Sequence, residues 1–138
     1  MPKLDTPESK PLADLASTIT EFARIRYALH NQVRGRIQSD LGAPGLMLNQ
    51  KLTAWWELPH LAAFRAELKK ALKTDVPLKE RDDWEHYLRA QQAEHTRLTA
   101  EIVRLETDLN GHVYRLFDLT PDEIQLIEDS TKYRYGEV

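Results

Sequence analysis

The chain has 138 residues, a formal net charge of −3 and no cysteine. Disulfides, thiolate nucleophiles and cysteine-ligated zinc are therefore excluded. The acidic balance argues against a generally basic nucleic-acid-binding protein but leaves room for a local basic patch. No apolar run approaches the roughly 18–20 residues that span a bilayer, and Asp5 lies where the apolar part of a signal peptide would begin. We expect a soluble, cytoplasmic protein that makes no membrane contact.

Prolines and glycines divide the chain into segments. The two longest stretches without proline, 12–43 and 78–120, are rich in residues that favour helices. Three prolines fall within residues 1–11, which we predict to be a flexible lead-in. We predict a single helical domain over residues 12–129 and a tail over residues 130–138.

The first of these stretches carries an apolar pattern with alternating steps of three and four residues. Its members are Leu12, Leu15, Ile19, Phe22, Arg26, Leu29 and Val33. Such spacing is a heptad seam, here with Arg26 as its one polar member. The pattern predicts a helix from about residue 12 to residue 41, with Gly42 as its C-terminal cap.

The second stretch has a longer seam with the same alternation of steps. Its members are Trp84, Leu88, Gln91, His95, Leu98, Ile102, Leu105, Leu109, His112 and Leu116. The pattern predicts a helix over about residues 80–117, roughly 55 Å long at 1.5 Å per residue. A helix of that length exceeds what a compact domain of this size requires.

Two shorter helices are also predicted. One has an apolar face formed by Leu61, Phe64, Leu68 and Leu72. The other begins at Thr120, with Pro121 at the first helical position and Glu123 at the capping-box position. We expect this last helix to turn Ile124 and Ile127 toward the core.

These elements predict an all-α fold, because no segment shows the alternation typical of a strand. The two long helices should pack antiparallel as a coiled-coil-like hairpin, and the shorter helices should cover one end of it.

The sequence lacks the motifs of the common catalytic and cofactor sites. It has no glycine-rich phosphate loop, no Gly-x-Ser-x-Gly elbow and no His-x-x-x-His pair. Glu57 and His60 have the spacing of a di-iron ligand pair, but no second Glu-x-x-His occurs. We therefore predict no catalytic residue, no cofactor and no metal site.

Two features could mediate binding. Four arginines and no acid lie between residues 24 and 36, and they could form a phosphate-binding face or pair with the acidic stretch 101–129. Arg34 and Arg36 are the better candidates for phosphate contact, because Arg26 is on the seam. The adjacent Trp55 and Trp56 would point about 100° apart on a helix. Either one is core and the other faces a partner, or both pack over the hairpin.

The segment LTAEIVRLETDLNGHVYRLFDLTPDEIQLIE, residues 98–128, resembles the C-terminal end of bacterial adenine-specific DNA methyltransferases, including type IIG restriction-modification enzymes. The resemblance is carried by Ile102, Leu105, Glu106, Leu109, Asn110, Val113, Tyr114, Leu116, Leu119, Thr120, Glu123 and Ile124. Trp55-Trp56, Pro77-Leu78 and Trp84-Glu85-x-Tyr87-Leu88 are similar to the segment that precedes that helix in the family.

The chain departs from this family where the chemistry would lie. Those enzymes bind S-adenosylmethionine at a Phe-x-Gly-x-Gly-like turn and hold a flipped adenine with an Asn/Asp-Pro-Pro-Tyr/Phe motif, and this sequence has neither. The resemblance implies a non-catalytic helical module, not an enzyme by itself, that contacts a methyltransferase catalytic domain or subunit or, weakly, the backbone of duplex DNA. The candidate nucleic-acid contacts are Arg24, Arg34, Arg36 and Lys51.

A second interpretation stays open beside this one. The seams are also typical of a stand-alone coiled-coil module for protein interaction or homo-oligomerisation.

Overall fold

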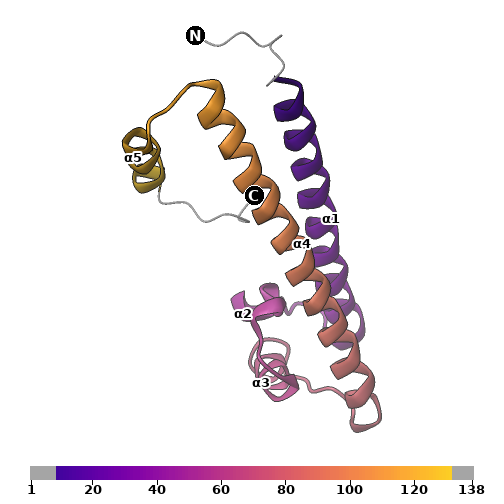
Figure 1. The fold of residues 1–138 in the computed structure, drawn as a ribbon. Helices are drawn as coiled ribbons and strands as arrows, with labels where there is room; N and C mark the ends of the chain where they lie inside the picture. Colours follow the sequence, from indigo (N-terminus) through magenta and orange to yellow (C-terminus); the bar gives the residue numbers. More distant parts are fainter. Residues whose placement is uncertain (1–8, 132–138) are drawn as a thin grey trace. The chain divides into compact units, whose positions relative to one another are not determined.

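The computed structural model describes residues 9–131, and within that range the chain is all-α, as predicted. Its helices are α1 (Ser9–Leu41), α2 (Gln50–Thr53), α3 (Leu61–Ala71), α4 (Arg81–Leu116) and α5 (Pro121–Thr131), with 3-10 turns at Trp55–Glu57 (η1) and Leu78–Glu80 (η2) (Figure 1). Among the described residues, no helix combines the length and the apolar content needed to cross a membrane.

The helices belong to two compact units. The central unit comprises residues 26–96, and the terminal unit combines residues 1–25 with residues 97–138. Each unit contains one part of α1 and one part of α4. The prediction of one folding domain stays a prediction.

The lead-in and tail predicted from the sequence lie mostly outside the described residues. Helix α1 begins at Ser9, so the last three residues of the predicted lead-in are helical. Pro11 is compatible with this start, because the first N–H groups of a helix have no partner within it and its fixed φ suits the first turn.

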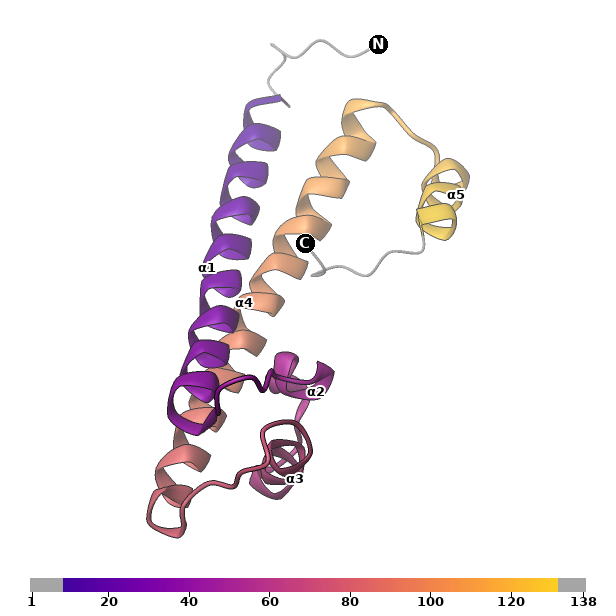
Figure 2. The same ribbon diagram turned by 180° about the vertical axis from the view of Figure 1, so that it is seen from behind.

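In the terminal unit, α1 and α4 lie side by side and antiparallel, as Figures 1 and 2 show from opposite sides. Ile19, Ile102 and Leu105 form the buried cluster between them. The partly buried side chains packed against this cluster are Leu15, Phe22, Ala23 and Leu109. These residues come from the two predicted seams, which are therefore confirmed in this unit.

Specific local caps end α4 and begin α5. Asp118 adopts a left-handed backbone conformation (φ 52°), and Leu119 N–H donates to the Tyr114 carbonyl at 3.0 Å, which is a Schellman cap. The predicted capping box follows: Thr120 Oγ1 accepts from Glu123 N–H at 3.2 Å, and the Glu123 carboxylate accepts from Thr120 N–H at 3.0 Å. The start of α5 was thus correctly predicted.

The predicted orientation of α5 is wrong in part. Ile124 is half-buried, but Ile127 is 40% exposed and Leu126 is 69% exposed. The reason lies in α4, whose last fully sheltered seam member is Leu105, while Leu109 and the later seam residues are only half-buried. The end of the seam therefore offers no closed core that α5 could complete.

The central unit has a fuller core, because α2, η1 and α3 pack on its segments of α1 and α4. Phe64 of α3 stacks on Trp84 of α4 with ring centroids 5.7 Å apart. The side chains with no measurable exposure are Val33, Ile37, Leu52, Trp55, Phe64, Leu68 and Val76. The predicted apolar face of α3 is confirmed, and the short helices cover the long ones within this unit.

The turn after α1 depends on a glycine, as predicted, although for a different reason. Gly42 N–H donates to the Gln38 carbonyl at 3.0 Å, and its φ is not in the left-handed region. A side chain at this position would collide with the backbone oxygen of Gln38. The missing Cβ, rather than a left-handed cap, permits the turn.

Candidate functional site

The arginines of the predicted basic cluster are each held by neighbours. Arg24 lies in the terminal unit and contacts the Glu21 carboxylate at 2.6 Å on its own helix, with both side chains exposed. In the central unit, Arg36 contacts Asp40 at 3.2 Å, and its guanidinium lies 4.1 Å from the ring centroid of Tyr87. The charges of Arg24 and Arg36 are thus largely balanced on α1 itself.

Arg34 has a structural position. Its Nε donates to the Thr53 carbonyl at 2.8 Å, which ties α1 to the end of α2. Its guanidinium also donates to Asn31 at 3.1 Å and lies 5.5 Å from the ring centroid of Trp56. The structure therefore gives Arg34 a role in holding the central unit together.

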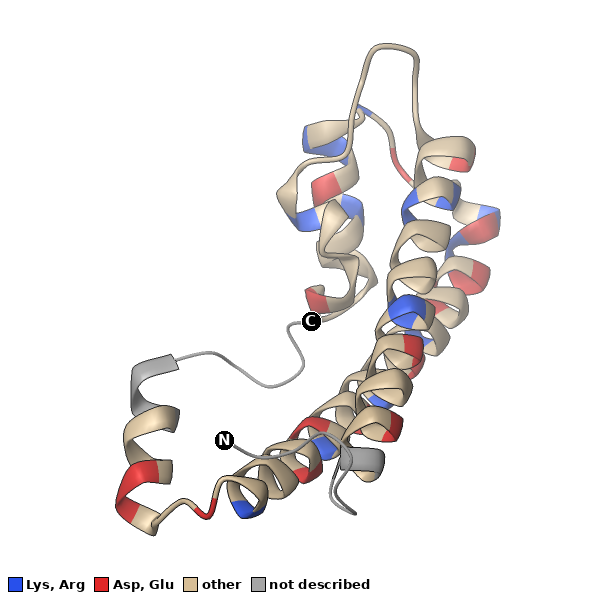
Figure 3. Cartoon of the chain, turned by 90° about the horizontal axis from the view of Figure 1, so that it is seen from above, with Lys and Arg blue, Asp and Glu red and all other residues tan. Residues whose placement is uncertain are grey.

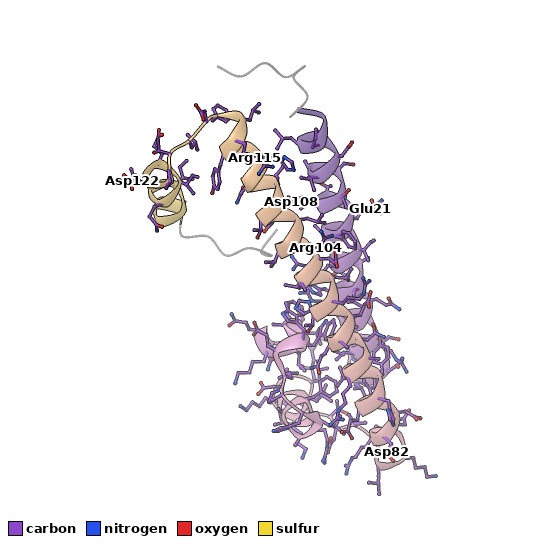
Figure 4. The ribbon with its side chains drawn as sticks, in the orientation of Figure 1. Glu21, Asp82, Arg104, Asp108, Arg115 and Asp122 are labelled. Carbon is purple, nitrogen blue, oxygen red and sulfur yellow. The ribbon has the colours of Figure 1, made fainter. Side chains whose placement is uncertain are left out.

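The predicted pairing between these arginines and the acidic stretch 101–129 is not the arrangement found for Arg24, Arg34 and Arg36. Charges in the acidic stretch instead have close neighbours on their own helix, with Arg104 contacting Glu101 at 2.8 Å. Figure 4 labels Arg104 and Asp108 along α4 and Asp122 on α5.

Lys51, the fourth predicted contact, belongs to a different charged group. Its ammonium lies 3.9 Å from the carboxylate of Glu67, and the ammonium of Lys70 lies 3.6 Å from it. Glu67 is buried and accepts a hydrogen bond from the Asn49 side chain at 3.0 Å. Both lysine side chains are 69% exposed, so one buried carboxylate holds two cations at the surface.

Asp75 forms a second centre of the same kind. Arg65 donates to both of its carboxylate oxygens, at 2.8 and 2.9 Å, and Val76 N–H donates at 2.7 Å. Lys69 and Arg81 each lie 3.5 Å from the carboxylate. The hydrogen bonds from Arg65 hold the pKa of the Asp75 carboxyl well below its usual range, so this acid stays ionised.

We call the five cations held by these two acids the acid-anchored cation surface: Lys51, Arg65, Lys69, Lys70 and Arg81. Figure 3 colours Lys and Arg blue, and blue segments recur on the short helices α2 and α3 of the central unit. Of this group, the four candidate contacts predicted from the sequence include only Lys51. The available signal was the run of basic residues at the end of α3.

A cluster of aromatic and imidazole rings lies elsewhere in the central unit. Nε2 of His30 and Nδ1 of His95 are 2.8 Å apart and share a hydrogen bond between α1 and α4. The Trp56 indole stacks on both imidazoles, with centroid distances of 3.8 Å to His30 and 5.0 Å to His95. Trp55 is fully buried, and its indole N–H donates to the His30 carbonyl at 3.2 Å.

Both imidazoles of this cluster resist protonation. Burial is the main cause that lowers the pKa of His30 to about 4, and repulsion from a protonated His95, from Arg34 and from Arg26 acts in the same direction. Burial and the charge of Arg26 also lower the pKa of His95. At neutral pH the pair is therefore uncharged, with one ring donating to the other.

The histidine–tryptophan cluster holds elements together. Gln92 of α4 adds hydrogen bonds to the carbonyls of Trp55 and Leu58, at 3.1 and 2.9 Å. The described residues contain no group of three or more His, Asp or Glu side chains that could hold a metal ion. Of the two predicted arrangements for the tryptophans, Trp55 is core and Trp56 is half-buried. The pairing of His30 with His95 was not foreseen.

The chain belongs to a protein family whose model is described as a domain of unknown function (DUF8810), which matches residues 5–113. The match includes the whole central unit and ends before α5. No curated protein and no solved structure matches the chain.

Proposed function

We propose that this chain is a non-catalytic helical module of a bacterial DNA-modification methyltransferase system. It binds the catalytic body of the methyltransferase or the backbone of duplex DNA, and the catalytic domain is supplied elsewhere. The observation that carries the proposal is the resemblance over residues 98–128, which form the second half of α4, the cap at Asp118 and α5.

The way these residues are buried supports a binding role. Ile102 and Leu105 of the resembling run are buried in the seam and serve the fold. Beyond them, Phe117 is 52% exposed and Leu126 is 69% exposed, on either side of the capped turn. Exposed large apolar side chains close together in the sequence suit contact with a protein surface.

The test is binding to a bacterial adenine-specific DNA methyltransferase, measured by calorimetry with purified components. We expect Phe117→Lys combined with Leu126→Lys to weaken binding at least tenfold, because each change puts a charge into an apolar contact. Ala100→Lys, at an exposed position of α4, is the matched control and should bind like wild type.

Activity provides the complementary test. The purified chain should transfer no methyl group from S-adenosylmethionine to DNA, because the cofactor and adenine motifs are missing from its sequence. Methyl incorporation that survives repurification would refute the non-catalytic role. If the chain binds neither the methyltransferase nor DNA, the proposed module is refuted.

One observation favours the alternative, an oligomerisation module. Tyr27 of α1 is a large side chain that is 67% exposed. If light scattering shows a dimer that Tyr27→Lys converts to a monomer, self-association is the better account of this surface.

A further inference from the structure

We propose that the acid-anchored cation surface, rather than the arginines of α1, contacts the phosphate backbone of duplex DNA. The inference rests on the proposed function and moves its nucleic-acid contact from α1 to the acid-anchored cation surface. Of the four contacts predicted from the sequence, it keeps Lys51 and replaces Arg24, Arg34 and Arg36.

The first argument is the local excess of positive charge. Residues 49–81 contain seven Lys and Arg against four Asp and Glu, while the whole chain has a net charge of −3. Five of these cations share only the carboxylates of Glu67 and Asp75. On α1, by contrast, Arg24 and Arg36 each have one acid of their own, and the guanidinium of Arg34 is held by the Thr53 carbonyl and Asn31.

The second argument is the way in which the cations are held. Glu67 is buried and fixed by Asn49, and Asp75 is fixed by Arg65 and the backbone of Val76. The lysine side chains that contact these two anchors remain 60–69% exposed. Side chains that are already oriented lose less conformational freedom when they bind phosphate.

The third argument separates DNA from an acidic protein as the partner. The exposed positions of α3 are Ala62, Ala66, Lys69 and Lys70. They include no aromatic or large apolar side chain, the residue types that supply most of the energy at protein interfaces, and within residues 49–81 Leu78 is the one exposed large apolar side chain. A polymer with regularly spaced phosphates needs only the cations, and such binding carries no sequence preference.

The experiment compares two double variants of the full chain that each remove two positive charges. Lys69→Gln with Lys70→Gln changes the cation surface, while Arg24→Gln with Arg89→Gln changes two arginines that are each 74% exposed. Filter binding of a short duplex at about 50 mM salt, repeated at higher salt, gives the affinity and the salt slope. Circular dichroism checks that each variant keeps its helices.

We expect the lysine variant to bind about tenfold more weakly and to lower the salt slope by about two. The arginine variant should stay within about twofold of wild type. Equal losses in both variants would show that only net charge matters and would overturn the proposed surface.

Two further outcomes also overturn it. Polyglutamate binding as tight as DNA binding would identify an acidic protein as the partner. If wild type does not bind DNA at all at 50 mM salt, the inference fails, whereas the proposed function is still decided by the calorimetric titration with the methyltransferase.

Discussion

The central and terminal units use the same two long helices but bury the seams to different degrees. In the central unit Val33 and Ile37 have no measurable exposure, because α2, η1 and α3 add a further layer. In the terminal unit Ile102 is equally buried, but Leu15 and Leu109 on its flanks are only half-buried. Two paired helices fully bury only the central residues of their seam, and a third layer of helices is needed to bury the flanking ones.

This difference should appear in stability. Full burial of a Leu, Ile or Phe side chain contributes about 1.5–3 kcal/mol relative to exposure, and the central unit holds more such side chains. The following changes test the comparison, from the largest expected effect to the smallest.

Phe64→Ala should cost the most, about 3–5 kcal/mol, because it leaves a cavity against Trp84 in the closed layer. Urea unfolding followed by circular dichroism measures the loss. Ala62→Gly on the same helix is exposed and should cost about 1 kcal/mol through helix propensity alone. Similar losses in the two variants would contradict the closed core.

Leu105→Asp should cost about 3 kcal/mol, because it places a charge in the buried cluster of the terminal unit. Ala100→Asp puts the same charge at an exposed position of the same helix and should cost less than about 1 kcal/mol, chiefly through helix propensity. If Leu105→Asp melts within about a degree of wild type, the helix pairing in this unit is wrong.

Two glycines of the central unit should respond in opposite directions to alanine. Gly42→Ala should destabilise by about 1–2 kcal/mol, because the new Cβ would collide with the Gln38 carbonyl. Gly35→Ala meets nothing within 4 Å inside α1 and should stabilise by about 0.5–1 kcal/mol. Thermal melts of both variants measure the difference, and equal signs would contradict the local geometry.

The smallest expected effect depends on pH. The folded-state pKa of His30, about 4, lies below its unfolded value near 6.5. Between pH 4 and 6.5 the unfolded chain therefore binds more protons than the folded chain. The contribution to stability is complete above about pH 6.5 and is lost progressively as the pH falls toward 4. The half-exposed site limits the effect, so we expect Tm to drop by about 2–4 °C between pH 7.5 and 5. His30→Gln combined with His95→Gln should flatten this dependence, and an unchanged slope would refute the assignment.

The fold was largely predictable because its determinants are local or periodic. The seams follow from spacing alone, and the start of α5 follows from Thr120, Pro121 and Glu123. The short helix α2 was missed, although Asn49 caps it by accepting from Leu52 N–H at 2.9 Å. Four residues are too few for a periodic pattern, so only the cap could have indicated this helix.

The candidate sites were less predictable because they depend on contacts between distant residues. His30 and His95 lie 65 positions apart and meet only when α1 and α4 pair. Asp75 gathers Arg65, Lys69 and Arg81 through the loop after α3, which no helical spacing describes. A charge count found the basic residues of α1, but it could not show that Arg24 and Arg36 pair with acids of their own helix or that Arg34 is held by the Thr53 carbonyl.

The placement of the tryptophans has a spectroscopic consequence. Trp55, Trp56 and Trp84 are the chain's three tryptophans, and all lie in the central unit. Their fluorescence therefore reports on the central unit alone, whereas far-ultraviolet circular dichroism reports on the helices of both units. Coincident unfolding curves from the two signals would show one cooperative transition. A helical signal that is lost before the fluorescence changes would show that the terminal unit melts first, and no introduced probe is needed to see it.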